Sequence, residues 1–323
     1  MPSDTPERKY SAEEMADIRQ RVDQELRDAD LTRKQAALEC GIPYGTLTPF
    51  LGGTYAGDGS RIAARLELWL ASRQRRQAIR AALPSQAFVA TPTADAIHGL
   101  LSHAQHMPDM VTITGAPGTG KTFALCQYVR TSPNVWKIVA EPALATTRAL
   151  LGALASALGG YDQGSQHRIS RDIARRLTGT GGLIAVDEAQ HLSSVMLDQL
   201  RAFHDQCGVG IALVGNEGIV GRIEGGRRNA EFAQLTSRVG MRMRRPKPQR
   251  GDVDALLDAW TIEADAVRRM LSAVARAPGG LRAMHKCFRL ASMVAANEGR
   301  AVSAEDVSLA AERLQTQLPR EAA

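Results

Sequence analysis

The chain has 323 residues, 44% of them hydrophobic and 23% charged, which is long enough for two or three domains with buried cores. Its formal net charge of +6 favours a polyanionic partner without naming one. No apolar run approaches the roughly 18 residues of a membrane span and the first residues are polar, so we expect no membrane partner and a cytoplasmic location.

The start of the chain predicts a helical domain. Residues 12–29 carry apolar side chains at helical spacing among dense charge, which indicates an amphipathic helix. Next, Ala37 stands four residues before Gly41, and Leu47 and Phe50 stand six and nine after it. This spacing is typical of a helix-turn-helix, in which a small residue lies at the helix crossing and glycine makes the turn. An ordinary helical hairpin is the alternative.

The second helix of this pair is expected to read DNA bases weakly. Pro49 lies inside it and can kink its last turn, and its exposed positions carry few basic side chains. We therefore expect contacts with DNA phosphates from Arg33 and Lys34, with Thr46 on the second helix. A further helix is predicted from Arg61 to about residue 82, before a linker.

The segment MVTITGAPGTGKT, residues 110–122, predicts a nucleotide site. A short β-branched strand, a G-x-x-x-x-G-K-T loop and an apolar helix follow one another, as a phosphate-binding loop requires. The expected nucleotide-binding residues of the loop are Gly115, Ala116, Pro117, Gly118, Thr119, Gly120, Lys121 and Thr122. Lys121 supplies a positive charge to the phosphates, and the Thr122 hydroxyl is expected to ligate Mg2+.

Strands and helices then alternate, which predicts an α/β fold with a parallel sheet and helices on both faces. We expect strands at 110–114, 135–140, 182–186, 210–214 and 239–243, and helices near 121–131, 145–158, 168–178 and 193–206. Beyond Pro246 only helices are predicted, at 252–260, 263–275, 280–297 and 303–316. The expected domains are therefore a helix-turn-helix domain over 1–85, an α/β core over 86–246 and a helical C-terminal lid over 247–323.

Polar residues at strand and helix ends supply candidates for the chemistry. Asp187 and Glu188 end an apolar strand, and we assign Asp187 to Mg2+ and Glu188 to the general base. Asn216 follows the next strand and is placed to orient the attacking water, with a simple turn residue as the alternative. Arg282, one turn into a lid helix, is placed to contact the γ-phosphate.

A further arginine is expected to act on a neighbouring subunit. Arg238 lies at a helix-to-strand junction far from the loop, and arginines that stabilise transition-state charge are often supplied in trans. Arg227 and Arg228 compete for this role, and a surface salt bridge is the alternative for Arg238. The basic segment 241–250 either faces DNA or is a solvated linker.

These motifs, in this order, resemble those of an AAA+ ATPase with a P-loop core. Over nearly the whole chain the sequence resembles the family of the phage Mu transposition protein B, ATPases that select target DNA. The segments that carry this resemblance are GTLTPFLGGTYAGD, FVATPT, GAPGTGKT, NVWKI, RRLTGTGGLIAVDEAQHL, LVGNEGI, GGRRNAEFAQLTSRV and PGGLRAM.

The resemblance implies DNA-dependent ATP hydrolysis with Mg2+ and largely sequence-nonspecific binding of double-stranded DNA as a helical filament. It also implies delivery of that DNA to a MuA-like transposase, stimulation of strand transfer and target immunity, in the cytoplasm of a bacterial host. The family's basic loop before the helix at 168 is poorly basic here, so Arg171, Arg175 and Arg176 are expected to contact DNA instead. The alternatives are a related AAA+ regulator or loader for another recombinase, and an ATP-switched helix-turn-helix transcriptional regulator.

Overall fold

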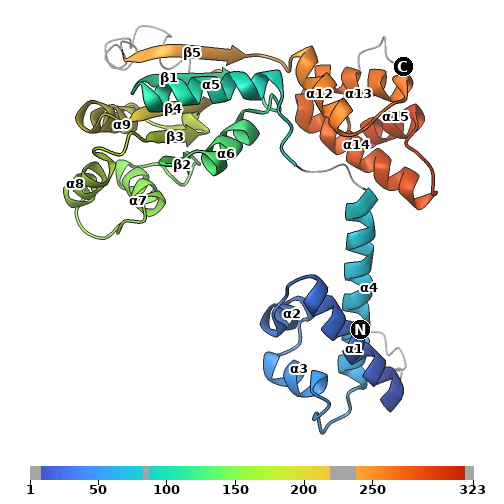
Figure 1. Ribbon diagram of the computed structural model, residues 1–323. Coiled ribbons are helices and arrows are strands. Elements are labelled where there is room, and N and C mark those ends of the chain that lie inside the picture. The colour runs from blue at the N-terminus through green and yellow to red at the C-terminus, as the bar shows by residue number, and fades with distance from the viewer. Residues whose placement is uncertain (1–8, 83–86, 219–237, 317–323) are drawn as a thin grey trace. The chain divides into compact units, whose positions relative to one another are not determined.

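The computed structural model describes residues 9–82, 87–218 and 238–316 (Figure 1). The chain divides into two compact units, Met1–Pro84 and Ser85–Ala323. Within the described ranges, no helix is both long enough and apolar enough to cross a bilayer.

The first unit is all helical. Its helices are α1 (Ala12–Asp28), α2 (Arg33–Cys40), α3 (Tyr44–Leu51) and α4 (Ser60–Ala82). The turn between α2 and α3 contains Gly41 in the left-handed region, with φ +64°, and the buried Ala37, Leu47 and Phe50 join one core. The predicted pair of helices is therefore present. α3 continues through Pro49 and ends at Leu51, so the proline does not terminate it.

A five-stranded parallel sheet forms the centre of the second unit. Its strands are β1 (Met110–Gly115), β2 (Val135–Val139), β3 (Leu183–Asp187), β4 (Gly210–Gly215) and β5 (Val239–Arg245), in the order β2-β3-β4-β1-β5. All five predicted strands are confirmed, and their ends differ from the prediction by no more than two residues.

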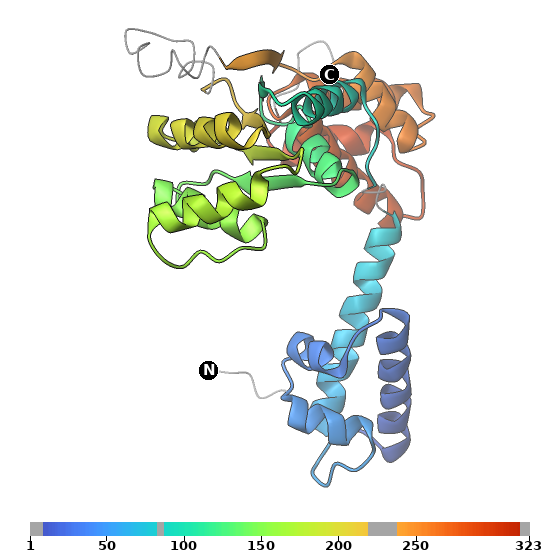
Figure 2. The same cartoon turned by 60° about the vertical axis from the view of Figure 1, so that its left-hand side comes forward.

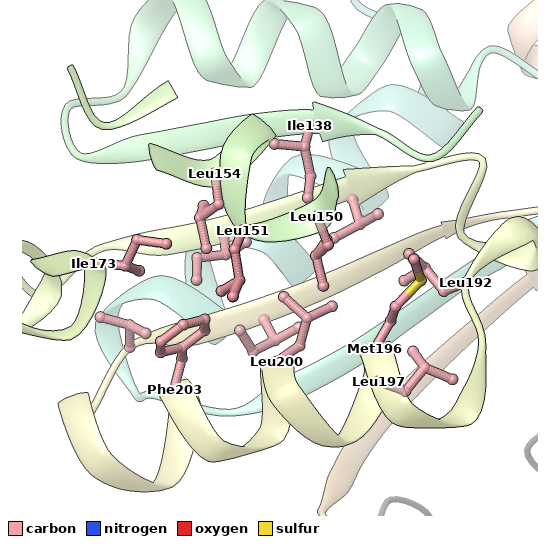
Figure 3. Close-up of a cluster of buried hydrophobic side chains, with 14 of the residues drawn as sticks. Ile138, Leu150, Leu151, Leu154, Ile173, Leu192, Met196, Leu197, Leu200 and Phe203 are labelled. Atoms are coloured by element: carbon pink, nitrogen blue, oxygen red, sulfur yellow. The ribbon is translucent and has the colours of Figure 1, made fainter. Parts of the chain in front are cut away.

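Helices cover both faces of this sheet (Figures 1 and 2). One face carries α5 (Pro92–His106) and α6 (Lys121–Thr131), and the other carries α7 (Thr147–Ala157), α8 (Gln166–Leu177) and α9 (Ser194–Cys207). Figure 3 shows the second core, in which leucines of α7 and α9 meet Ile138 of β2 and Ile173 of α8. The three inner strands, β1, β3 and β4, are buried along their whole length, which explains why they carry almost no charged side chains.

The C-terminal helices, here called the lid, are α12 (Arg250–Ala259), α13 (Asp265–Arg276), α14 (Gly280–Asn297) and α15 (Ala304–Arg313). They enclose a core of their own that includes Leu257, Leu271 and Met284. The carboxyl ends of the strands face the lid in Figure 1. Functional groups at these strand ends therefore lie between the sheet and the lid.

Candidate nucleotide-binding site

The glycine-rich loop connects β1 to α6, and different structural constraints require glycine at different positions of it. Gly118 and Gly120 have φ values of +83° and +90°, which side chains with a Cβ rarely adopt. A Cβ on Gly115 would lie 2.0 Å from the carbonyl oxygen of Arg245, at the end of β5. The loop thus depends on glycine both for its curvature and for its close packing against the sheet.

Lys121 opens α6 and folds over the loop. Its Nζ donates to the carbonyl oxygens of Gly115 at 2.8 Å and Ala116 at 2.9 Å. Burial lowers the pKa of Lys121, while the charges of Glu188 and Asp187 oppose that shift. A phosphate oxygen is a stronger acceptor for an ammonium group than a carbonyl oxygen, so this side chain is placed to bind a polyphosphate.

Asp187, at the end of β3, is 3% exposed and faces α6. Its Oδ1 accepts a bond from the Thr122 hydroxyl at 3.4 Å and from the Glu188 N–H at 3.1 Å. A hydroxyl beside a carboxylate offers the hard oxygen ligands that Mg2+ prefers, so this pair fits the metal. Lys137 of β2, whose Nζ lies 3.6 Å from Oδ2 of Asp187, was not predicted from the sequence. Only the pairing of β2 with β3 brings it there.

Glu188 and Asn216 are connected through a third side chain. Nε2 of Gln190 donates to Oε2 of Glu188 at 2.5 Å, and Oε1 of Gln190 accepts the Asn216 N–H at 3.2 Å. Glu188 itself has a positive φ of 55°, unusual for a residue with a Cβ. Gln190 is a second residue that the sequence analysis missed, because only the adjacency of β3 and β4 places Asn216 within its reach.

A cavity of about 680 Å³ lies above these groups, which is a common volume for a small-molecule site. The core side of its wall includes Phe88, whose ring stacks on that of Phe123 with centroids 5.7 Å apart. The lid side includes Trp260, Arg282 and His285. Burial, followed by the charge of Arg289, lowers the pKa of His285. The aromatic residues and His285 were not predicted as part of the site.

The structure gathers most of the predicted nucleotide residues around this cavity. Its walls include Gly115, Pro117, Gly118, Thr119, Gly120, Lys121, Thr122, Asp187, Glu188, Asn216 and Arg282, and Ala116 belongs to the same loop. The glycine-rich loop, two strand ends and one lid helix thus contribute to one site.

Arg238 is not among them. It precedes β5, and its neighbour Val239 pairs with Met110, at the amino end of β1. The loop follows the carboxyl end of β1, about 17 Å away along a six-residue strand. Arg238 instead lies 3.5 Å from Asp205, and its side chain is 54% exposed. Arg227 and Arg228 lie outside the described residues.

The predicted DNA-contacting residues lie in both units. Arg33 of α2 is exposed and lies 3.7 Å from Asp23, Lys34 is exposed, and Thr46 of α3 is half-buried. On α8, Arg171 is exposed, whereas Arg175 and Arg176 both contact the carboxylate of Asp172. These two arginines, Arg176 foremost, lower the pKa of Asp172.

Comparison with known proteins gives two family matches and several relatives. Residues 105–223 match the AAA domain family, and residues 237–314 match the family described as Mu B transposition protein, C terminal. The ATP-dependent target DNA activator B of Escherichia phage Mu is 35% identical over 90% of this chain and 92% of its own length. The Mu-like prophage FluMu DNA transposition protein B of Haemophilus influenzae is 32% identical over 83% of this chain and 94% of its own. Domain III of the Thermotoga maritima replication initiation protein DnaA aligns with 70% of this chain and 94% of that one, at 14% identity and a TM-score of 0.48.

Proposed function

This chain belongs to the family of Mu B transposition proteins and has an AAA+ ATPase fold, and from that premise we propose that it is an ATPase that assembles on double-stranded DNA. In this proposal ATP binding forms a helical filament, which presents the DNA to a MuA-like transposase and stimulates strand transfer. Hydrolysis then drives disassembly and target immunity. The name of the phage Mu relative supports the ATP and target-DNA parts of the proposal. The observation that carries it is the meeting of Lys121, Thr122 and Asp187 in one cavity.

The roles within the site follow from the chemistry of each group. Lys121 and the N–H groups of the loop bind the phosphates, and Arg282 contacts the γ-phosphate from the lid. Thr122 and Asp187 would hold Mg2+, which neutralises phosphate charge when bound.

Two further residues of the site are proposed to act on the attacking water. Glu188 accepts its proton, and Asn216 orients it. Gln190 contacts both residues and therefore sets the position of Glu188 relative to Asn216.

Arg238 is proposed to complete the site of an adjacent subunit. It directly precedes β5, at the amino end of the strands, whereas the loop follows the carboxyl end of β1, so Arg238 does not reach the loop of its own chain. A head-to-tail arrangement of subunits is the simplest way to bring such an arginine to a γ-phosphate, and such arrangements form open filaments unless the rotation closes. The ion pair with Asp205 is exposed, and such pairs contribute little stability, so it is easily exchanged.

The DNA contacts are proposed to be electrostatic. Arg33 and Lys34 with Thr46 in the first unit, and Arg171, Arg175 and Arg176 on α8, supply them. Because phosphate neutralisation releases counterions, affinity for DNA should fall steeply with salt concentration.

Electron microscopy of the full chain with duplex DNA, with and without ATP and Mg2+, tests this proposal. Filaments are expected only with ATP, and Lys121→Ala should abolish them because the phosphates lose their ammonium partner. Thermal unfolding of the variant serves as the control for folding. Equal filaments without nucleotide would overturn the proposal. So would a footprint on one discrete DNA sequence without ATP turnover, which is the behaviour of a transcriptional regulator.

A further inference from the structure

A fully buried carboxylate joins the lid to the α/β core. Asp252, in the first turn of α12, is 0% exposed, and Thr93, in the first turn of α5, is 2% exposed. Oδ1 of Asp252 accepts the Thr93 backbone N–H at 2.8 Å. Oδ2 accepts the Thr93 hydroxyl at 2.7 Å and the Gln249 N–H at 2.8 Å. No arginine or lysine in the described part of the chain forms an ion pair with this carboxylate.

The surroundings of Asp252 compensate for its burial. An ionised carboxylate loses its hydration inside a protein, and hydrogen-bond donors must replace that water. Here three donors do so, and α5 and α12 both direct their positive amino ends at the same carboxylate. The helix ends also touch, because a Cβ on Gly251 would lie 3.0 Å from Cγ of Pro92. Without the negative charge, two positive helix ends would face each other with unsatisfied N–H groups.

Only part of this arrangement is needed to cap α12. The bond from the Gln249 N–H satisfies the amino end of α12 itself. Both bonds from Thr93 cross to a helix 159 residues away in sequence, and Thr93 supplies one of the N–H groups that α5 leaves without an intrahelical partner. The carboxylate therefore holds the amino end of α12, in the lid, against the amino end of α5, in the α/β core.

This contact between α5 and α12 lies beside the nucleotide cavity, whose lining includes Thr91 and Ala94 on either side of Thr93. α12 carries Leu256 and α5 follows Phe88 and Val89, and all three side chains line the cavity. The same lid brings Arg282 to the cavity on α14, where the Leu281 N–H donates to the carbonyl oxygen of Gly118 at 2.9 Å. The lid thus contacts the core at the loop and at Asp252.

We infer that Asp252 is a positioning residue for nucleotide binding, which holds the lid on the core in the orientation that places Arg282 against the phosphates. This inference rests on the proposed function, because it requires ATP in the cavity. It assigns to Asp252 an effect on ATP affinity that is transmitted through Arg282.

The lid contains a matched control for this residue. Asp306 is 4% exposed, occupies the same third position of its helix, α15, and completes a capping box with Ser303. Its other partner is Arg300, also in the lid. Asp306→Asn therefore perturbs a buried helix-capping carboxylate as Asp252→Asn does, but leaves intact the joint with the core, which is the contact between Asp252 and Thr93.

A double-mutant cycle on the full chain, with ATP affinity measured by isothermal titration calorimetry in the presence of Mg2+, tests the inference. Asp252→Asn is expected to weaken ATP binding about tenfold, since an amide leaves one of the facing N–H or O–H donors unpaired. Asp306→Asn is expected to change it by less than about twofold. Arg282→Ala should lose most of its effect in the Asp252→Asn background and keep its full effect in the Asp306→Asn background, because coupled residues are non-additive.

Thr93→Val provides a milder variant that keeps the backbone bond and removes only the hydroxyl, with an expected loss of about threefold. It replaces Asp252→Asn in the same cycle if that variant does not fold, as judged by circular dichroism. The inference would be overturned if the effects of Arg282→Ala and of Asp252→Asn or Thr93→Val on ATP affinity were additive. It would also be overturned if these two variants lost no more ATP affinity than the control, Asp306→Asn. If the unmodified chain does not bind ATP, the proposed function fails instead.

Discussion

In the proposed mechanism, Glu188 is the residue on which hydrolysis depends most directly. Its backbone lies in the left-handed region, which costs of the order of 1 kcal/mol for a residue with a Cβ, and its carboxylate is held by Gln190. Strained residues persist where their surroundings determine them, and here the adjacent Asp187 accepts the Glu188 N–H. The exposed carboxylate is therefore held beside the cavity by the Gln190 side chain.

Glu188→Gln should separate ATP binding from ATP hydrolysis. The amide has the same shape but does not accept a proton, so turnover should fall by about 100-fold or more while ATP affinity changes little. Filaments on DNA should then persist after a chase with excess ADP, as followed by light scattering. Disassembly of the variant at the unmodified rate would contradict the assignment of Glu188.

Asp306 makes the stability of the lid depend on pH. Hydrogen bonds from Arg300 and Ser303 hold the pKa of this carboxyl well below its usual range. A lowered pKa stabilises the fold fully above the unfolded value of about 4, and the stabilisation is lost as the pH falls toward the folded value. Asp306→Asn should therefore cost about 2 kcal/mol at pH 7. The difference from the unmodified chain in thermal unfolding should shrink between pH 4 and pH 3, and a constant difference would show that ionisation of Asp306 is not the cause.

At the scale of elements, the phosphate-binding loop and the amino end of α14 behave as one packed unit. A Cβ on Gly118 would lie 1.8 Å from the carbonyl oxygen of Gly279, and this backbone cannot move without moving α14. The first turn of that helix carries Arg282 to the cavity. Loop conformation and lid position are thus linked directly through backbone contacts.

Gly118→Ala should weaken ATP binding at least tenfold, because the added methyl group separates the lid from the loop and the positive φ is unfavourable for alanine. Gly99→Ala is the matched control. A Cβ there meets no atom within 4 Å in the middle of α5, so this change should leave ATP affinity unaltered and raise stability by about 0.5–1 kcal/mol. Equal ATP affinities for the two variants, measured by calorimetry, would contradict the link between loop and lid.

The sequence predicts the elements themselves because their signals are local. Apolar periodicity places the strand and helix ends to within three residues. The loop glycines and the pair at the end of β3 are also local signals. By contrast, Lys137, Gln190 and the joint between Thr93 and Asp252 depend on strand order and on contacts between distant segments. No spacing along the chain records those contacts.

At the scale of the whole molecule, the loop and Arg238 lie at opposite ends of the strands. This placement predicts active sites that are shared between neighbouring subunits. Lys121→Ala lacks the phosphate contact, and Arg238→Ala lacks the arginine offered to a neighbour. An equimolar mixture of the two should recover part of the DNA-stimulated ATPase activity, at most about a quarter of the unmodified rate, because only one junction in four pairs two intact halves. Each variant alone should be inactive in a phosphate-release assay. Failure of the mixture to exceed either variant would contradict a trans role for Arg238.

The same placement of Arg238 has a consequence for the ends of an assembly. When each subunit lends its arginine to the next, an open row of n subunits contains n − 1 finished sites and one unfinished site at a terminus. A solitary subunit then has no working site, and hydrolysis per subunit rises with the length of the row toward a plateau. In a long row, ATP would therefore be hydrolysed at the interior sites. The nucleotide of the terminal subunit, which no neighbouring arginine reaches, would remain unhydrolysed.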